Sequence, residues 1–252
     1  MFTRAILRRP GPDFASGLTT SALGPAELPA MLAQHAAYAA ALSRLGLQLE
    51  LLDPLPGFPD AYFVEDVAVI VPELAIVGRP GAPSRRGEAD AINFVLAKHR
   101  PVANLTGDAT LDGGDVLVVD KRVWVGRSSR TNQEGIAQLT ALLAPHGYEV
   151  RKAEVPDGLH FKSSVTYVGN GTLLATEAFA SLPALEGCAV ITAARGEEFA
   201  ANTLFVNGTL LVPAGAPETR QKLDALGVPI VALEISEVRK MDGGLTCMSL
   251  RL

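Results

Sequence analysis

Short apolar segments alternate with small polar turns along most of the chain, a pattern typical of paired β-strands. The pattern forms a repeated unit of two strands, whose copies begin near Val64, at Leu111, at Leu159 and at Phe199. Turns of two or three residues separate the paired strands: Pro72-Glu73, Asp120-Lys121, Gly169-Asn170-Gly171 and Asn207-Gly208. Because Asn-Gly is the strongest short hairpin signal, each unit is predicted to contain a β-hairpin.

Helical patterns lie between the predicted hairpins. Apolar residues recur at helical spacing in four segments: 28–46, 84–99, 132–147 and 217–227. The first segment ends at Gly46, a residue that commonly stops a helix. Three of the segments lead into another extended stretch, at 101–105, 148–155 and 228–233. The predicted unit is therefore strand, strand, helix, strand, and the fold class is α/β.

Residues with catalytic chemistry recur at a nearly constant spacing. Glu65, Asp112 and His160 are separated by 47 and 48 residues, and Phe199 precedes Cys247 by 48. A fixed period of this length predicts a propeller-like array. The C-terminal GGLTCMSLRL begins a fifth unit, and the N-terminal FTRAILRRPG resembles the second strand of a unit. We therefore expect the two termini to complete one blade and to close the ring without an exposed sheet edge. An open α/β sheet with coincidental spacing is the alternative.

Composition limits the class of protein. The chain has 252 residues, of which 48% are hydrophobic and 19% charged, and no Gly/Ser linker divides it, so we predict a single domain over residues 1–252. A net charge of −5 argues against nucleic acid or anionic membranes as partners. No segment approaches the roughly 20 apolar residues of a membrane span, and the N-terminus has no apolar stretch of signal length. The two cysteines do not form a disulfide pattern, which favours a reducing, cytoplasmic location.

A propeller would bring Cys247, His160 and Asp112 together around one axis. A cysteine nucleophile needs a group that keeps it as thiolate and a group that delivers a proton to the leaving atom. His160 can deliver the proton, and Asp112 can orient His160 and stabilise its charged form. The structural alternatives are an inert buried cysteine and a hydrogen-bonded core histidine.

Other charged residues indicate the kind of ligand. Asp60, Glu65 and Asp66 would converge on the channel and demand a cationic partner, because burying unpaired carboxylates is strongly unfavourable. A planar, permanently charged guanidinium fits such a site better than an ammonium. Arg85 and Arg130 follow the second strands of successive units, where they suit a carboxylate ligand. Solvated strand edges and loops are the alternatives for these residues.

The stretches DAYFVEDVAVI, RPGAPSRR, LDGGDVL, GRSSRTNQEG, LHFKSSV and DGGLTC together resemble the dimethylarginine dimethylaminohydrolase family of the guanidino-modifying pentein superfamily. The resemblance runs from Asp60 to Cys247. It implies a five-bladed ββαβ propeller with pseudo-fivefold symmetry and a site on the axis. It also implies hydrolysis of Nω-methylated arginines (mono- or asymmetric dimethylarginine) to citrulline and methylamine or dimethylamine, through a covalent cysteine thiouronium.

The resemblance also implies a role for each site residue. Cys247 corresponds to the nucleophile, His160 to the general acid and base, and Asp112 to its carboxylate partner, which is Glu in some relatives. The implied substrate contacts are Leu18 in a lid, Asp60 on the α-amino group, Glu65 and Asp66 on the guanidinium, Arg85 and Arg130 on the α-carboxylate, and Asp242 beside the nucleophile. No metal or organic cofactor is expected, and zinc at Cys247 and His160 would act as an inhibitor.

Two other functions stay open at the level of sequence. An arginine deiminase of the same superfamily would act on unmethylated arginine, although such enzymes usually carry an inserted helical domain that this pattern lacks. A ribosome-binding translation factor with the same fold is the non-enzymatic alternative, but it has no need of a cysteine, a histidine and a carboxylate in phase. The preferred methylation state and the presence of a homodimer also stay open.

Overall fold

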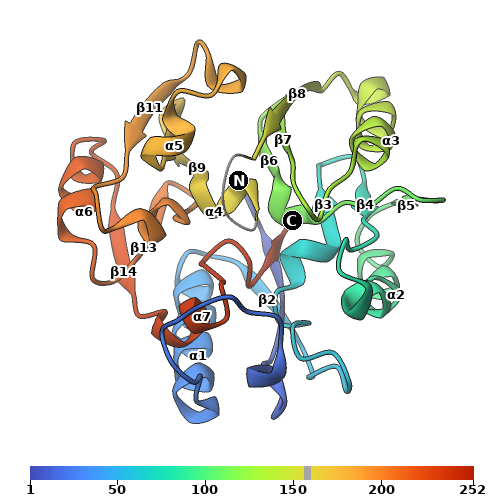
Figure 1. The fold of residues 1–252 in the computed structure, drawn as a ribbon, viewed down its shortest axis with the longest axis horizontal. Helices are drawn as coiled ribbons and strands as arrows, with labels where there is room; N and C mark the ends of the chain where they lie inside the picture. The colour runs from blue at the N-terminus through green and yellow to red at the C-terminus, as the bar shows by residue number, and fades with distance from the viewer. Residues whose placement is uncertain (156–159) are drawn as a thin grey trace.

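The computed structural model describes residues 1–155 and 160–252, and the strands of that part of the chain form five separate three-stranded sheets. The sheets surround a central axis, and the longer helices lie at the outer rim (Figure 1). Leu159, the predicted start of the third repeat, lies outside the described residues. The helices are α1 (Leu28–Arg44), α2 (Arg86–Leu96), α3 (Gln133–Leu143), α4 (Phe161–Ser164), α5 (Glu177–Ala180), α6 (Pro217–Asp224) and α7 (Ser236–Lys240).

Every sheet has the same topology, with an antiparallel pair followed by a strand parallel to the second. The first four are β3 (Ala68–Ile70), β4 (Ala75–Val77) and β5 (Val102–Asn104); β6 (Val116–Val119), β7 (Arg122–Arg127) and β8 (Glu149–Glu154); β9 (Val165–Gly169), β10 (Thr172–Ala175) and β11 (Ala189–Thr192); and β12 (Leu204–Val206), β13 (Thr209–Pro213) and β14 (Ile230–Leu233). The predicted ββαβ unit is therefore confirmed.

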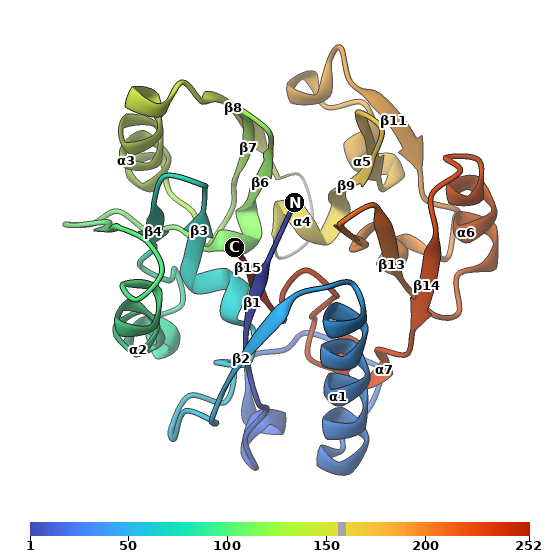
Figure 2. The ribbon, with the colours of Figure 1, turned by 180° about the vertical axis from the view of Figure 1, so that it is seen from behind.

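The fifth sheet joins the two ends of the chain. It contains β15 (Leu250–Arg251), β1 (Arg4–Arg8) and β2 (Gln48–Leu52) in that order. β1 pairs antiparallel with β15, and the Thr3 amide donates to the carbonyl of Leu252 at 2.8 Å. Both views place the two termini near the centre of the ring (Figures 1 and 2). The prediction that the termini complete one blade is confirmed.

Local turn chemistry fixes the hairpins. Asp120, Asn170 and Asn207 adopt positive φ values of 53°, 51° and 47°, and Gly208 follows with 85°. Asn, Asp and Gly are the residues that tolerate this left-handed conformation, which a tight hairpin turn requires. The turns therefore help to fix the register of the antiparallel strands that they connect.

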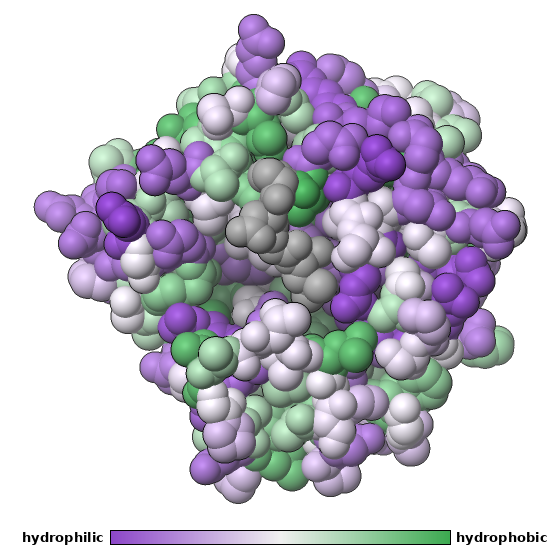
Figure 3. All heavy atoms as spheres, in the orientation of Figure 1, coloured by the Kyte–Doolittle hydropathy of each residue, from purple (hydrophilic) through white to green (hydrophobic). Residues whose placement is uncertain are grey.

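The core is divided among the blades. One apolar cluster includes Ile76 from β4, Val123 from β7 and Leu139 from α3, so it lies between the first two blades. Another includes Trp124 and Phe161, which pack between the second and third. Hydrophilic side chains cover much of the outer rim, with apolar ones scattered between them (Figure 3). Among the helices described here, none has both the length and the apolar character needed to cross a membrane.

A short helical turn precedes the inner strand in four blades. Each turn is closed by an i+3 backbone hydrogen bond: Asp66 to Phe63, Asp115 to Asp112, Ser163 to His160 and Asn202 to Phe199. Glu65 and Asp66 therefore lie in the 3-10 helix Val64–Val67, and the first strand of the unit that was predicted to begin near Val64 starts at Ala68. Cys247 likewise sits in a turn ahead of β15. Since neighbouring side chains diverge in a tight turn, adjacent residues reach different sides of the ring.

Candidate active site

A small cavity of about 20 Å³ lies where the turns meet. Its lining contains eight of the predicted site residues: Leu18, Asp60, Asp66, Arg85, Arg130, His160, Asp242 and Cys247. Phe63, Met241 and Gly243 complete the lining. The fold thus gathers residues from both ends and the middle of the chain. Because this volume accommodates about one water molecule, lining residues must move before a larger ligand can bind.

Cys247 presents a buried thiol to this cavity. Cys247 is 9% exposed, and Nδ2 of Asn202 donates a hydrogen bond to its Sγ at 3.7 Å. Burial, together with the negative charges of Asp66 and Glu65, raises the pKa of Cys247 to about 12. The sulfur is therefore protonated at neutral pH. A cation placed beside it would favour the thiolate.

His160 lies between two carboxylates. Its Nε2 is 3.0 Å from Oδ2 of Asp112, and its Nδ1 is 3.7 Å from Oδ1 of Asp66. Burial lowers the pKa of His160, but the charge of Asp66 and the hydrogen bond with Asp112 outweigh it and raise the pKa to about 9. The imidazole is thus charged at neutral pH and can act as a proton donor. The raised pKa stabilises the fold fully below the ordinary value of 6.5, and this contribution is lost as pH rises through about 9.

Asp112 reaches His160 despite having one methylene less than glutamate. It is fully buried, and its second oxygen, Oδ1, accepts a hydrogen bond from the Gly81 amide at 2.9 Å. Both carboxylate oxygens therefore have partners. This arrangement fixes the orientation of the imidazole ring.

Arg85 forms ion pairs with two carboxylates of the protein, Asp66 and Glu88. Its Nη1 contacts Asp66 at 2.6 Å, while its Nε and Nη2 contact both oxygens of Glu88 at 3.0 and 2.8 Å. All three side chains are buried. The expected contact of Arg85 with a substrate carboxylate thus competes with these ion pairs. Arg130, which is partly exposed at the cavity, has no such commitment among the interactions of the described residues.

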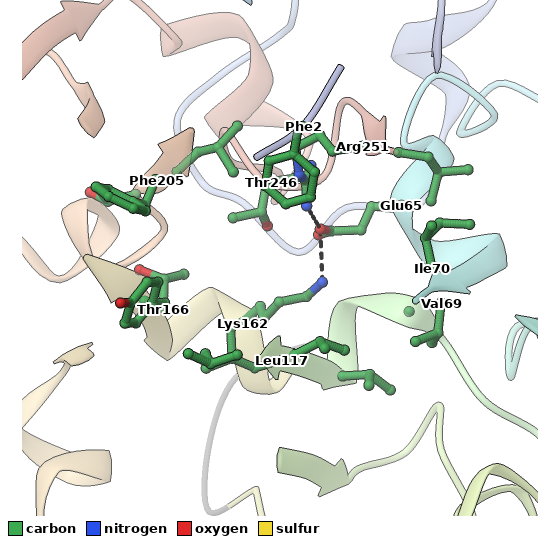
Figure 4. Close-up of a pocket in the computed structure, with 18 of the residues that line it drawn as sticks. Phe2, Glu65, Val69, Ile70, Leu117, Lys162, Thr166, Phe205, Thr246 and Arg251 are labelled. Carbon is green, nitrogen blue, oxygen red and sulfur yellow. Dashed lines mark hydrogen bonds and ion pairs between the residues drawn. The ribbon is translucent and has the colours of Figure 1, made fainter. Parts of the chain in front are cut away.

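Glu65 does not line the small cavity. Its Oε1 accepts from Nζ of Lys162 and from Nη2 of Arg251, both at 2.7 Å, while its buried Oε2 has no hydrogen-bond partner among the described residues. These three residues line a second, larger cavity (Figure 4). Glu65 remains close to Cys247, because its amide donates to the Cys247 carbonyl at 3.1 Å.

The loop that contains Leu18 is fastened across the small cavity. The Leu18 amide donates to both oxygens of Asp60, at 3.0 and 3.2 Å. Two residues later, the amide and hydroxyl of Thr20 donate to Oδ2 of Asp242 at 2.5 and 3.0 Å. Two of the predicted substrate contacts, Asp60 and Asp242, therefore hold this loop in its present position. Leu18 itself is 43% exposed.

Sequence reasoning missed four polar residues around the site: Glu88, Lys162, Asn202 and Arg251. Asn202 occupies the last position of its turn, which is the position of Asp66 and Asp115 in the first two blades. An alignment of the repeats on the last residue of each turn would have identified Asn202 as a site residue. Lys162 follows His160 by two positions, and only the diverging side chains of the turn reveal that it reaches the other cavity.

Asp66, Asp112 and His160 form the one cluster of potential metal ligands found among the described residues, with ligand atoms within 4.8 Å of one another. Arg85 and the charged imidazole already neutralise the two carboxylates. The cluster therefore lacks the excess negative charge that a divalent cation prefers.

Replacing Gly114 with alanine should displace the His160 imidazole and lower any activity that depends on it. The added Cβ would lie 2.6 Å from Nδ1 of His160 and 2.7 Å from Oδ1 of Asp66, so the imidazole must shift. Displacing a catalytic group by about 1 Å can lower a rate about 100-fold, and we expect kcat/KM to fall by that order. Steady-state kinetics beside a thermal melt would test this. A variant with wild-type kcat/KM would show that the ring tolerates displacement.

The chain is similar to known proteins in both sequence and fold. Residues 19–165 match the family described as arginine deiminase. The chain is 38% identical over 253 residues to N(G),N(G)-dimethylarginine dimethylaminohydrolase of Pseudomonas aeruginosa, with 100% of both chains covered. A solved structure of the Pseudomonas aeruginosa enzyme, a cysteine-to-serine variant complexed with citrulline, matches with a TM-score of 0.98 at 37% identity, again over 100% of each chain. A dimethylarginine dimethylaminohydrolase with a histidine-to-glycine change, bound as an adduct with S-methyl-L-thiocitrulline, matches with a TM-score of 0.97 at the same identity and coverage.

Proposed function

Because the chain belongs to the dimethylarginine dimethylaminohydrolase family, we propose that it hydrolyses Nω-methylated arginines to citrulline and methylamine or dimethylamine. The observation that carries this proposal is a pair of buried carboxylate oxygens, Oε2 of Glu65 and Oδ1 of Asp66, that have no hydrogen-bond partner among the described residues. A planar guanidinium supplies charged N–H donors for two such oxygens. Bound between them, it would present its central carbon to Cys247.

The substrate itself would activate the thiol. In the absence of substrate, Cys247 keeps its proton because its pKa is about 12. A bound guanidinium places a positive charge beside the sulfur and offsets the charges of Glu65 and Asp66, so the pKa of the thiol falls. The reactive thiolate then forms only when its target is present.

His160 would serve both chemical steps. The thiolate attacks the guanidinium carbon, and His160 donates its proton to the departing amine as the C–N bond breaks, leaving a covalent thiouronium. The neutral imidazole then takes a proton from water, which attacks the same carbon. Cleavage of the C–S bond releases citrulline and regenerates Cys247. Asp112 and Asp66 stabilise the imidazolium that both steps use.

A direct assay tests the function. Purified protein would be incubated with monomethylarginine, asymmetric dimethylarginine or arginine, and citrulline and the released amine would be quantified. We expect citrulline with methylamine or dimethylamine from the methylated substrates. Ammonia from arginine at a higher kcat/KM would instead identify a deiminase, and absence of citrulline from all three would refute the proposed reaction.

We also propose that Arg130 binds the substrate α-carboxylate, since it lines the cavity and Arg85 is held by Asp66 and Glu88. Replacing Arg130 with methionine should raise KM for Nω-methyl-L-arginine about tenfold or more, with a smaller change in kcat, because a charged hydrogen bond is lost. Nω-methylagmatine, which lacks the carboxylate, serves as the control substrate. Equal losses for both substrates would contradict this role.

The pH dependence of kcat/KM follows from the resting protonation states. The resting pair is a neutral thiol with a pKa of about 12 and an imidazolium with a pKa of about 9. The reacting pair, thiolate and imidazolium, holds one proton fewer. Because the first proton of the pair dissociates near pH 9, kcat/KM should rise about tenfold per pH unit below that value and then level off. A profile that is flat around neutral pH would show that the resting enzyme already holds a thiolate.

We further propose a cytoplasmic enzyme whose partner is this small molecule. Both cysteines are free, and a nucleophilic thiol at Cys247 must stay reduced to act. A reducing compartment meets that requirement. Fractionation followed by the citrulline assay would test the location.

A further inference from the structure

Residues that are adjacent or nearly adjacent in sequence line two different cavities. Neighbouring residues divide between them: Asp66, His160 and Cys247 line the small cavity, and Glu65, Lys162 and Thr246 line the large one of about 570 Å³. Glu65 lines the large cavity together with Lys162 and Arg251, which both bind its Oε1 (Figure 4). Its orientation thus depends on residues outside the small cavity.

Arg251 connects Glu65 to the segment that carries the nucleophile. Its Nη2 donates to Oε1 of Glu65 at 2.7 Å. Its Nη1 donates to the Thr246 carbonyl at 3.1 Å and to the Ser249 carbonyl and hydroxyl at 2.6 and 2.9 Å. The planar guanidinium therefore bridges a carboxylate and the backbone on both sides of Cys247.

A buried hydrogen bond between Ser249 and Tyr38 supports the position of Arg251. The Ser249 hydroxyl, which accepts from Arg251, lies 2.7 Å from the hydroxyl of Tyr38 in α1. Ser249 is 0% exposed and Tyr38 is 1% exposed. A lysine in place of Arg251 would keep the charge but lose the rigid fork that contacts three partners together.

We propose that Arg251 is a positioning residue for guanidinium binding. It holds Oε1 of Glu65, which leaves Oε2 free for the substrate and fixes the carboxylate relative to Cys247. This inference rests on the proposed function, because it assigns Glu65 to the substrate guanidinium. Without Arg251, Lys162 alone holds Oε1, and the carboxylate can rotate about that single contact.

The test compares a guanidinium substrate with a neutral thiol reagent in the variant Arg251→Lys. We expect kcat/KM for Nω-methyl-L-arginine to fall roughly tenfold to 100-fold, mostly through KM, because a fixed charged contact is lost. Alkylation of Cys247 by iodoacetamide, which has no guanidinium, should stay within about twofold of wild type. Arg4→Lys is the matched control, since Arg4 lies on β1 beside β15 and its side chain donates only to the exposed Gln48 among the hydrogen bonds of the described residues. It should leave both rates unchanged.

Two results would overturn the proposal. One is a kcat/KM within about threefold of wild type. The other is an equal fall in turnover and alkylation, which would mean that Arg251 supports the Cys247 turn and not the orientation of Glu65. Melting temperatures of both variants would show whether the fold is intact.

A binding experiment separates this inference from the proposed reaction. Calorimetry with L-arginine would use Cys247→Ser and the double variant Cys247→Ser/Arg251→Lys, neither of which needs turnover. A tenfold or greater loss of affinity in the double variant supports the positioning role even if wild type forms no citrulline. Equal affinities in an enzyme that does form citrulline would refute the positioning role alone. No binding of L-arginine to either protein would refute the positioning role, while the citrulline assay with methylated substrates decides the proposed reaction.

Discussion

Replacing Cys247 with serine is expected to abolish citrulline formation, lowering kcat on the order of 10⁴-fold or more. A hydroxyl is a far weaker acid than a thiol, and the buried, negatively charged setting that raises the pKa of Cys247 to about 12 would disfavour an alkoxide even more. Serine is slightly smaller than cysteine, so the contacts with Asn202 and Thr246 need only small adjustments. The variant should therefore fold and still bind the substrate.

Cys188→Ser provides the matched control. Cys188 is the other free cysteine, and it packs against the apolar cluster between the second and third blades. Its kcat should stay within about twofold of wild type, since it lies outside the site. Mass spectrometry of acid-quenched reactions should detect the thiouronium adduct in wild type and Cys188→Ser only. Citrulline formation by Cys247→Ser at a near wild-type rate would refute the covalent route.

The fold was predictable because its determinants are local. The hairpin turns need residues that tolerate positive φ, and Asp120, Asn170 and Asn207 stand at those positions. The ββαβ order follows from short alternations between strand and helix patterns. The pairing of β1 with β15 was also predictable, because each terminal segment resembles half of a unit.

The site was predictable only in part, because adjacent side chains in a turn diverge. The repeat spacing grouped Glu65 with Asp112 and His160, yet Glu65 is bound from the large cavity by Lys162 and Arg251. Sequence spacing predicts the place of a residue within the repeat, but it does not predict which of the two cavities its side chain lines. The cavity that a side chain lines depends on the 3-10 turn, which the strand pattern concealed.

Arg85 and Arg130 show a second limit of prediction from sequence, because equivalent positions in the repeat need not have equivalent partners. Arg85 and Arg130 follow equivalent strands, and sequence treats them alike. In the structure, Arg85 is buried with two carboxylates, one of which is Glu88 in the first turn of α2. Removing one partner from such a buried group costs about 3–5 kcal/mol, so changes at Arg85 would confuse stability with binding. Arg130 is the cleaner residue for testing substrate recognition.

The second large effect is expected for His160→Gln, which should lower kcat for Nω-methyl-L-arginine about 10³-fold. An amine is a poor leaving group unless it is protonated, and His160, with a pKa of about 9, is the charged donor beside Cys247. Glutamine can keep a hydrogen bond to Asp112 but cannot donate a proton. Glutamine is also close to histidine in size, so the carboxylates of Asp66 and Asp112 should stay buried.

S-methyl-L-thiocitrulline separates proton donation from attack by the thiol. Its leaving group, methanethiol, departs as a thiolate and does not need protonation, so Cys247 in His160→Gln should still form the covalent adduct. Hydrolysis of that adduct should be slow, because the base that activates water is missing, and the adduct should accumulate in intact-protein mass spectra. If methylarginine turnover falls less than about tenfold, another group protonates the amine. If the adduct fails to form in a folded variant, His160 is needed to activate the thiol of Cys247. That result would contradict the proposal that the substrate's positive charge alone activates the thiol.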